Sequence, residues 1–195
     1  MKKLLIFAIS ALLFTGCTAS TSTPKPTSDP EPTYPSEVSL TTPEEAMLPK
    51  LVDSSVKDML KRVENKESFV VYFGFEGCPW CAEAKPILKQ VMVDYDHDVY
   101  YIDTRKNPEW TSNTMIDDYD KLTEFLGDEL KKDDEGTPRL YTPYFIFIKD
   151  GEVVMTHQGT VEGYDAHERK MTDEEKDTFK ATLGEGFIKV FSQTE

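Results

Sequence analysis

Three segments of the chain repeat apolar residues at helical spacing, and each is predicted to form a helix with one apolar face. They cover about 50–64, the stretch that begins at Cys78, and 115–130. Pro86 lies inside the second segment and should bend that helix. The charged residues 131–136 follow the third segment and are predicted to form a loop.

A fourth helix is predicted near the C-terminus. Thr172 and Glu175 have the spacing of a capping box, in which each side chain accepts a hydrogen bond from the other residue's backbone N–H. Gly184 and Gly186 should weaken this helix near its end, because glycine is a poor helix former.

Four apolar segments of strand length lie between the helices. The segment 69–75 is almost continuously apolar, as expected for a central strand that is covered on both faces. Segments 99–103, 144–148 and 153–157 complete the set, and Asp-Gly within 149–152 predicts a hairpin between the last two. The order helix, strand, helix, strand, helix, strand, strand, helix predicts an α/β fold, a central mixed β-sheet flanked by helices on both faces.

Two cysteines stand where the first predicted strand runs into a helix. After a short bend at Glu76, Cys78 and Cys81 follow with the spacing C-x-x-C, and Pro79 is suited to the first helical position. The free N–H groups of a helix start favour the thiolate form of Cys78. Cys81, one turn further on, can attack a mixed disulfide formed at Cys78. The pair can therefore exchange a disulfide with a substrate and release it.

Two other interpretations of the cysteine pair remain open. A permanent structural disulfide would close a very short loop and stabilise the fold little. A metal site would need further ligands, and His97, His157 and His167 show no ligand spacing. We therefore expect redox chemistry, with no metal and no organic cofactor, because a dithiol carries the electrons itself.

The N-terminus has the pattern of an export signal. A charged start is followed by an apolar run over 4–14, which is too short to span a bilayer by itself, and then by Cys17. This ending resembles a bacterial lipoprotein signal, in which Cys17 is lipidated and becomes the mature N-terminus. The alternative is an ordinary secretory peptide with an incidental Cys17. Both interpretations predict an extracytoplasmic domain, and the first predicts one that is lipid-anchored to the cell membrane.

Composition predicts three parts of the chain. Residues 1–16 form the signal peptide, 17–45 a lipidated cysteine with a tether rich in Pro, Ser and Thr, and 46–195 one folded domain. The net charge of −14 makes nucleic acid and anionic lipid surfaces poor partners. Of the three cysteines, a lipidated Cys17 leaves a single pair, in a compartment where disulfides persist.

From about residue 50 to the C-terminus the chain resembles the thioredoxin superfamily. The motifs agree in order as well as type: a strand leading into C-x-x-C, Pro86 five residues after Cys81, Thr142-Pro143 just before a strand, and a closing hairpin with Gly159 beyond it. The resemblance implies a thioredoxin-like fold with an insertion before the cis-Pro strand, between 107 and 139. That insertion could shape a substrate groove or simply extend the scaffold.

The resemblance also implies roles for individual residues. Cys78 would be the attacking nucleophile and Cys81 the buried resolving cysteine. Thr142-Pro143 would be a cis peptide that faces the pair and offers backbone hydrogen bonds to a substrate. Pro79 in the first slot between the cysteines resembles glutaredoxins and the periplasmic disulfide oxidases, which leaves the direction of electron flow open.

Two positions near the cysteines invite further expectations. Thioredoxins carry a buried Asp six residues before the first cysteine as a proton acceptor for the second, and Tyr72 stands there in this chain. Glu76 is the nearest candidate for proton transfer, with a solvated loop carboxylate as the alternative. Trp80 is expected to be exposed beside the cysteines, where it could contact a peptide substrate, or else to pack near Pro143.

The sequence thus predicts a membrane-anchored, extracytoplasmic thiol-disulfide oxidoreductase that exchanges disulfides with exported proteins through Cys78 and Cys81. Its partners would be cysteine-containing exported proteins and a redox partner in or outside the membrane, and we expect a monomer. The alternative is a thioredoxin-fold accessory or binding module, similar to the bacteriocin-transport accessory proteins, without significant turnover.

Overall fold

The computed structural model describes residues 47–105 and 117–192. The predicted signal peptide, Cys17 and the tether, together with part of the predicted insertion at 107–139, lie outside these residues. Within the described part of the chain, no helix combines the length and apolar character needed to cross a membrane.

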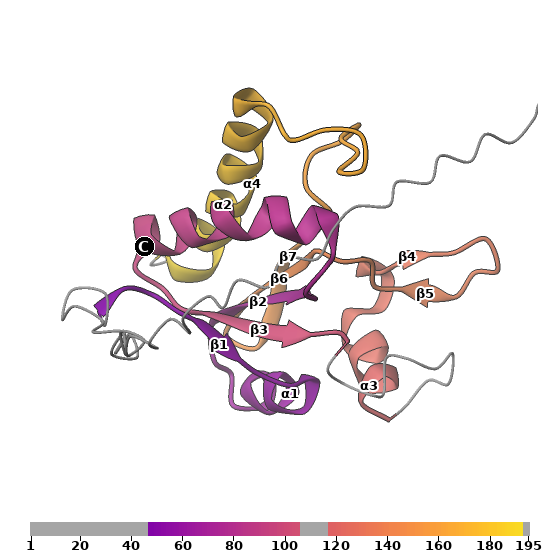
Figure 1. Ribbon diagram of the computed structural model, residues 1–195. Coiled ribbons are helices and arrows are strands. Elements are labelled where there is room, and N and C mark those ends of the chain that lie inside the picture. The colour runs from indigo at the N-terminus through magenta and orange to yellow at the C-terminus, as the bar shows by residue number, and fades with distance from the viewer. Residues whose placement is uncertain (1–46, 106–116, 193–195) are drawn as a thin grey trace, which may run out of the picture. The chain divides into compact units, whose positions relative to one another are not determined.

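A five-stranded sheet with the strand order β1-β3-β2-β6-β7 forms the centre of the domain (Figure 1). Strands β1, β3 and β2 run parallel, and β6 and β7 are antiparallel to their neighbours. The predicted mixed sheet is confirmed. Its strands are β1 (Leu51–Asp53), β2 (Phe69–Gly74), β3 (Val99–Asp103), β6 (Tyr144–Lys149) and β7 (Glu152–Gln158).

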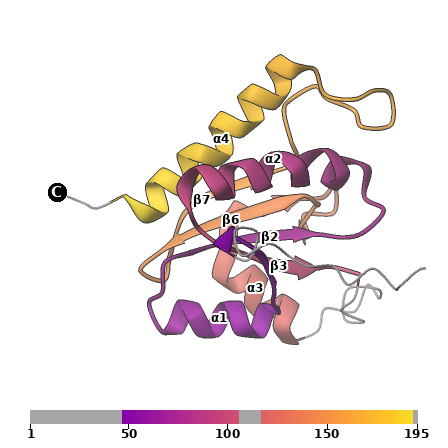
Figure 2. The ribbon, with the colours of Figure 1, turned by 60° about the vertical axis from the view of Figure 1, so that its left-hand side comes forward.

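Helices cover both faces of this sheet, as Figure 2 shows. Helices α2 (Pro79–Tyr95) and α4 (Asp173–Phe191) pack on one face, and α1 (Val56–Glu64) and α3 (Asp117–Leu126) pack on the other. The sheet therefore separates two hydrophobic clusters, and the face under α2 is the one that meets the cysteines.

Strand β2 is buried along its whole length, which explains its continuous apolar sequence. Because side chains alternate across a strand, Val70 and Tyr72 enter the cluster under α2, while Val71 and Phe73 enter the opposite one. This alternation places Tyr72 on the same side of the sheet as Cys81.

The predicted start of the first helix is wrong. Leu51 pairs in parallel with Val99 as part of β1, and α1 begins only after Ser55. The Ser55 hydroxyl accepts a hydrogen bond from the Asp58 N–H at 3.1 Å, which marks Ser55 as the N-cap. The apolar residues before the cap fit a helix and a strand equally well, so spacing alone could not separate the two.

The region around 115–136 also differs from the prediction. Helix α3 ends at Leu126 and a short 3-10 helix, η3 (Gly127–Glu129), follows it. Strands β4 (Lys131–Lys132) and β5 (Pro138–Arg139) then form a small antiparallel ribbon where a plain loop was predicted. Asp133 closes this ribbon, because its carboxylate accepts from both the Thr137 N–H and Arg139 Nε at 2.8 Å. Residues 115 and 116 of the predicted helix lie outside the described residues.

Helix α4 follows the predicted capping box and continues past both glycines to Phe191. Gly184 and Gly186 are buried against other elements. A Cβ added at Gly186 would lie 2.2 Å from a ring carbon of Phe147, and one at Gly184 would lie 2.9 Å from the Tyr95 hydroxyl. The two glycines therefore allow α4 to approach the sheet and α2 closely.

Candidate active site

Cys78 is the N-cap of helix α2, at the point where the chain leaves strand β2. Its backbone is extended (φ −78°, ψ 117°), Pro79 opens the helix, and the Cys78 sulfur accepts a hydrogen bond from the Cys81 N–H at 3.2 Å. Gly77, with φ of +87°, makes the preceding bend possible. The sequence spacing thus produces the predicted local structure: one cysteine at the helix end and the other one turn inside.

Both cysteines are free thiols and both are buried, each with 4% of its surface exposed. The cover over Cys78 comes from the residues before strand β6. The Cys78 sulfur lies 3.9 Å from the Thr142 carbonyl oxygen and 3.8 Å from the Thr142 hydroxyl. The Thr142-Pro143 peptide bond is cis, as the resemblance implies. The structure therefore brings Thr142 against the cysteine pair although 64 residues separate Thr142 from Cys78.

Trp80, between the two cysteines, is half-buried and packs against the segment that precedes helix α4. The indole N–H donates to the Tyr164 carbonyl at 3.5 Å, and the His167 ring meets the indole edge-on at 4.8 Å between centroids. Trp80 therefore contacts the connection between β7 and α4 instead of standing free in solvent.

This connection, residues 159–171, is held to helix α2 by Glu83. The Glu83 carboxylate accepts from the Met171 N–H at 3.2 Å and from Lys170 Nζ at 2.5 Å. Burial acts to raise the pKa of Glu83, but these two hydrogen bonds outweigh it and hold the pKa below its ordinary value. A signal was available in the sequence, because this polar stretch before the Thr172 cap is longer than a simple turn requires.

A pocket of about 420 Å³ opens behind the two cysteines. Strands β2 and β3, the bend after β2 and the first turns of α2 all contribute to it. Its walls are Tyr72, Phe75, Glu76, Gly77, Cys78, Cys81, Ala82, Lys85, Tyr101 and Asp103. The pocket therefore places several titratable groups beside the cysteine pair.

The surroundings of Cys81 disfavour its thiolate. Burial raises the pKa of Cys81 to about 11, and the hydrogen bond with Cys78 acts in the same direction. A backbone hydrogen bond from Phe75 and a side-chain hydrogen bond from Tyr72 act against this rise. Cys81 is thus a thiol at neutral pH that needs help to ionise.

Glu76, the candidate for proton transfer, is exposed and lines the same pocket. Among the described residues it makes no hydrogen bond to either cysteine sulfur, whereas Tyr72 does bond to Cys81. Tyr72, which stands where thioredoxins carry a buried Asp, is therefore the residue in contact with Cys81.

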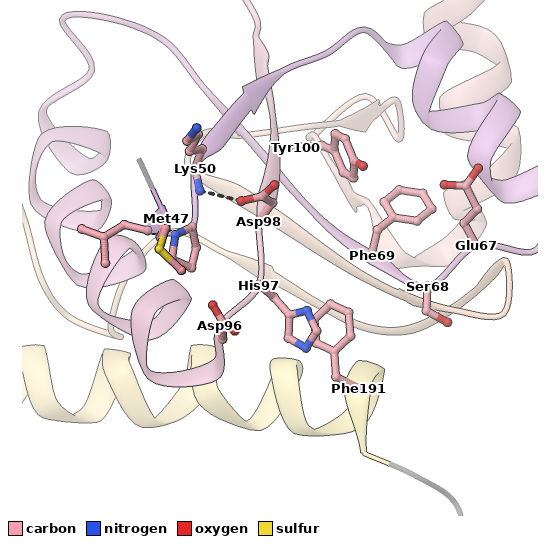
Figure 3. A pocket seen from close by; sticks show the side chains of 12 residues that line it. Met47, Lys50, Glu67, Ser68, Phe69, Asp96, His97, Asp98, Tyr100 and Phe191 are labelled. Carbon is pink, nitrogen blue, oxygen red and sulfur yellow. Dashed lines mark hydrogen bonds between the residues drawn. The ribbon is translucent and has the colours of Figure 1, made fainter. Parts of the chain in front are cut away.

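The three histidines lie in different places and none contacts a cysteine sulfur among the described residues. His97 stacks on Phe191 at 3.5 Å between centroids (Figure 3). His157 contacts the Thr160 carbonyl oxygen at 2.8 Å, and His167 meets Trp80. In the described part of the chain, no three His, Cys, Asp or Glu side chains gather as a metal ion would require.

A second pocket, of about 480 Å³, surrounds His97 (Figure 3). It lies where strands β2 and β3 begin, with Phe69 and Asp98 in its walls. Cys78 follows the other end of β2. Because β2 and β3 are parallel, this pocket and the cysteine pair lie at opposite ends of the sheet.

No protein-family model matches the chain. Solved structures that resemble it include thioredoxins. Thioredoxin from Trypanosoma brucei brucei is 13% identical over 76% of this chain and 96% of that one, with a TM-score of 0.46. The thioredoxin NaTrxh from Nicotiana alata is 15% identical over 73% and 94%, with a TM-score of 0.43. Fasciola hepatica thioredoxin is 19% identical over 59% and 89%, with a TM-score of 0.37.

The fold assignment rests on the chain's own topology. Strands β1, β3 and β2 are parallel, the β6–β7 hairpin closes the sheet, and helices cover both faces. A C-x-x-C pair follows β2 and a cis-proline precedes β6. This is the thioredoxin fold.

Proposed function

We propose that this protein is a thiol-disulfide oxidoreductase in which Cys78 attacks and Cys81 resolves. One observation carries the proposal: Cys78 caps helix α2 and faces the cis peptide Thr142-Pro143, with Cys81 one turn inside the same helix. The N-terminus of a helix is a favourable place for a nucleophilic sulfur, and the adjacent backbone is suited to pair with an extended substrate.

The reductive direction illustrates how the electrons balance. The Cys78 thiolate attacks one sulfur of a substrate disulfide, forms a mixed disulfide and releases the other substrate sulfur as a thiolate. Cys81 then loses its proton and attacks the Cys78 sulfur. The bond from Cys78 to the substrate breaks, the substrate leaves with two thiols, and the Cys78–Cys81 disulfide holds the oxidised state. The same steps in reverse would donate a disulfide.

For its place in the cell, we propose an extracytoplasmic protein anchored to the membrane through lipidated Cys17. The support is the charged start, the short apolar run and the tether in the sequence. Its substrates would be exported proteins that contain cysteines, and a redox partner in or outside the membrane would reset the pair. No organic cofactor is needed for this exchange.

Trapping the mixed disulfide tests the mechanism. The full chain carrying Cys17→Ser has Cys78 and Cys81 as its only cysteines. With Cys81→Ser added, the reduced variant should attack a disulfide of a test protein such as insulin and stay covalently bound to it through Cys78, because nothing resolves the mixed disulfide. Adding Cys78→Ser instead should abolish the adduct. The measurement is the mass of the intact protein after the reaction, and an equal adduct in both variants would contradict the assigned roles.

A binding module without significant turnover is the second candidate, and the burial of both cysteines favours it. Equilibration of the Cys17→Ser chain with glutathione buffers separates the two. A potential near about −270 mV would indicate a reductase, and one near about −120 mV a disulfide donor. If the pair failed to equilibrate, the result would favour the binding module over the oxidoreductase.

A further inference from the structure

Tyr72 occupies a fixed position deep in the sheet. Its side chain is 1% exposed, and its ring stacks on Phe145 at 5.1 Å and lies against Tyr101 at 5.3 Å between centroids. The hydroxyl end of the ring passes over Gly74, since a Cβ added there would be 2.5 Å from the Tyr72 oxygen. Packing therefore leaves this hydroxyl a single location, next to the bend that carries the cysteines.

The Tyr72 hydroxyl is hydrogen-bonded to Cys81 at that location. Tyr72 and Cys81 both line the 420 Å³ pocket, together with residues of β2 and β3. The other titratable groups that line this pocket come from β3, α2 and the bend. They are Tyr101, Asp103, Lys85, Glu76 and Cys78.

A buried phenol differs from a carboxylate in what it can do for a thiol. Burial, and the neighbouring Cys81 next, raise the pKa of Tyr72 far above its ordinary value, so the hydroxyl keeps its proton throughout the neutral range. It can always donate a hydrogen bond, and it cannot hold a negative charge in place of Cys81. A hydrogen bond to a charged acceptor is stronger than one to a neutral group.

We propose that Tyr72 is the positioning residue of the resolving step: its hydroxyl donates a hydrogen bond to the Cys81 sulfur and stabilises the thiolate as it forms. This inference rests on the proposed function. Cys81 loses its proton to water in the pocket and attacks Cys78, the bond from Cys78 to the substrate sulfur breaks, and the leaving thiolate takes up a proton from water. The substrate disulfide gains two electrons, the Cys78–Cys81 pair loses two as it becomes a disulfide, and Tyr72 keeps its proton and its charge throughout.

Tyr72 takes the role at Cys81 that was expected of Glu76. Glu76 is exposed, whereas Tyr72 is in contact with the sulfur. Tyr101 provides a matched comparison, because it lines the same pocket and also carries a phenol, but its hydroxyl is hydrogen-bonded to Asp103.

A chromogenic aromatic disulfide, 5,5′-dithiobis(2-nitrobenzoate), separates the two steps in the reduced full chain carrying Cys17→Ser. The first equivalent of coloured thiol reports attack by Cys78, and the second reports resolution by Cys81. We compare Tyr72→Phe with Tyr101→Phe and Glu76→Gln. All three substitutions conserve size, and thermal unfolding of each variant checks its packing.

Tyr72→Phe should slow the second phase at neutral pH. It should also shift the curve of rate against pH toward higher pH, by about one pH unit. The loss of a hydrogen bond to a charged acceptor is worth about a tenfold fall in thiolate. The less stable thiolate is roughly threefold more nucleophilic, so the net slowing should be about threefold. The first phase should not change, and Tyr101→Phe and Glu76→Gln should follow the parent curve.

Two results would overturn the inference: a parent-like second phase in Tyr72→Phe, or an equal displacement in Glu76→Gln. Either leaves the proposed function standing, since Cys78 still attacks and Cys81 still resolves. Absence of the first phase from the parent chain itself would instead count against the proposed function. A purely structural role for Tyr72 would lower the unfolding temperature without displacing the curve.

Discussion

The Tyr72 ring packs directly over Gly74, which leaves no room for a side chain at residue 74. The Tyr72 ring lies where a Cβ of Gly74 would be, with the hydroxyl oxygen 2.5 Å and the nearest ring carbon 2.7 Å from it. Gly74 ends strand β2, and its carbonyl oxygen accepts from the Thr104 N–H at 2.9 Å. Gly74 therefore acts on Cys81 indirectly: it leaves room for the Tyr72 ring, and the Tyr72 hydroxyl contacts Cys81.

Gly74→Ala should move the Tyr72 hydroxyl away from Cys81 without removing it. We expect the second phase of the chromogenic assay to be displaced toward higher pH, as in Tyr72→Phe, and the free energy of unfolding to fall by about 1–3 kcal/mol from overpacking. The double variant should show no more displacement than either single one, because both changes remove the same hydrogen bond. Additive displacements would mean that the two residues act independently.

At the residue scale, the positions of the cysteines could be predicted and their surroundings could not. Pro79 and the C-x-x-C spacing determine the helix start, because both act through local backbone geometry. The contact of Tyr72 with Cys81 depends on the strand register, which places side chains from different segments together. Glu76 was expected near the sulfur because it is close in sequence, and Tyr72 is close because β2 and α2 pack together.

At the scale of elements, Glu83 links helix α2 to the segment 159–171 that carries the contacts of Trp80. Its side chain is 11% exposed, and it satisfies the N–H of Met171 at the point where the segment enters α4. The ion pair with Lys170, which is 84% exposed, adds little by itself. The hydrogen bond to a backbone N–H is the larger contribution, because an unpaired buried N–H is costly.

Glu83→Ala should lower the free energy of unfolding by about 1–2 kcal/mol, whereas Glu83→Gln, which keeps an acceptor, should cost about 0.5 kcal/mol. In a Trp110→Phe background Trp80 is the only tryptophan, so its fluorescence reports the segment. The emission should shift to the red in Glu83→Ala. An unchanged spectrum would mean that Glu83 does not hold the segment.

The same link should depend on pH. The folded pKa of Glu83 lies below its ordinary value of 4.5, so the carboxylate stabilises the fold at higher pH, and this contribution is lost as pH falls through the folded pKa. Trp80 emission should therefore shift on acidification below about 4.5. Glu83→Gln should lack this transition, while Glu175, whose pKa is lowered to about 2 by Arg169, is present in both proteins and cancels in the comparison.

Helix α4 provides the other prediction at this scale. Gly186→Ala places a Cβ against the Phe147 ring, so helix α4 or the ring must move. Higher helix propensity should gain about 1 kcal/mol, but overpacking should cost about 1–3 kcal/mol, and the net result should be a less stable protein. Glu185→Ala, at an exposed neighbouring position, is the control and should change stability by less than about 0.5 kcal/mol. A stabilised Gly186→Ala protein would contradict the close packing.

For the molecule as a whole, the sequence predicts the central strands and the helices that cover them, but not the short strands at the edges of the fold. Buried central strands and capped helices carry strong local signals, as β2 and the Thr172 cap show. Strand β1 is short and its residues also fit the start of a helix, because only the pairing with Val99 makes it a strand. The β4–β5 ribbon was missed for the same reason, since two-residue strands have no periodicity to recognise.

The burial of both sulfurs also bears on how the protein withstands oxidants. A peroxide that reached Cys78 would convert its thiolate to a sulfenic acid, which condenses with a nearby thiol to a disulfide or is oxidised further to an irreversible sulfinic acid. With 4% of each cysteine exposed and Cys81 one helical turn away, condensation is favoured and a second oxidant molecule has little access. The architecture that presents Cys78 to Thr142 thus also protects it from irreversible damage.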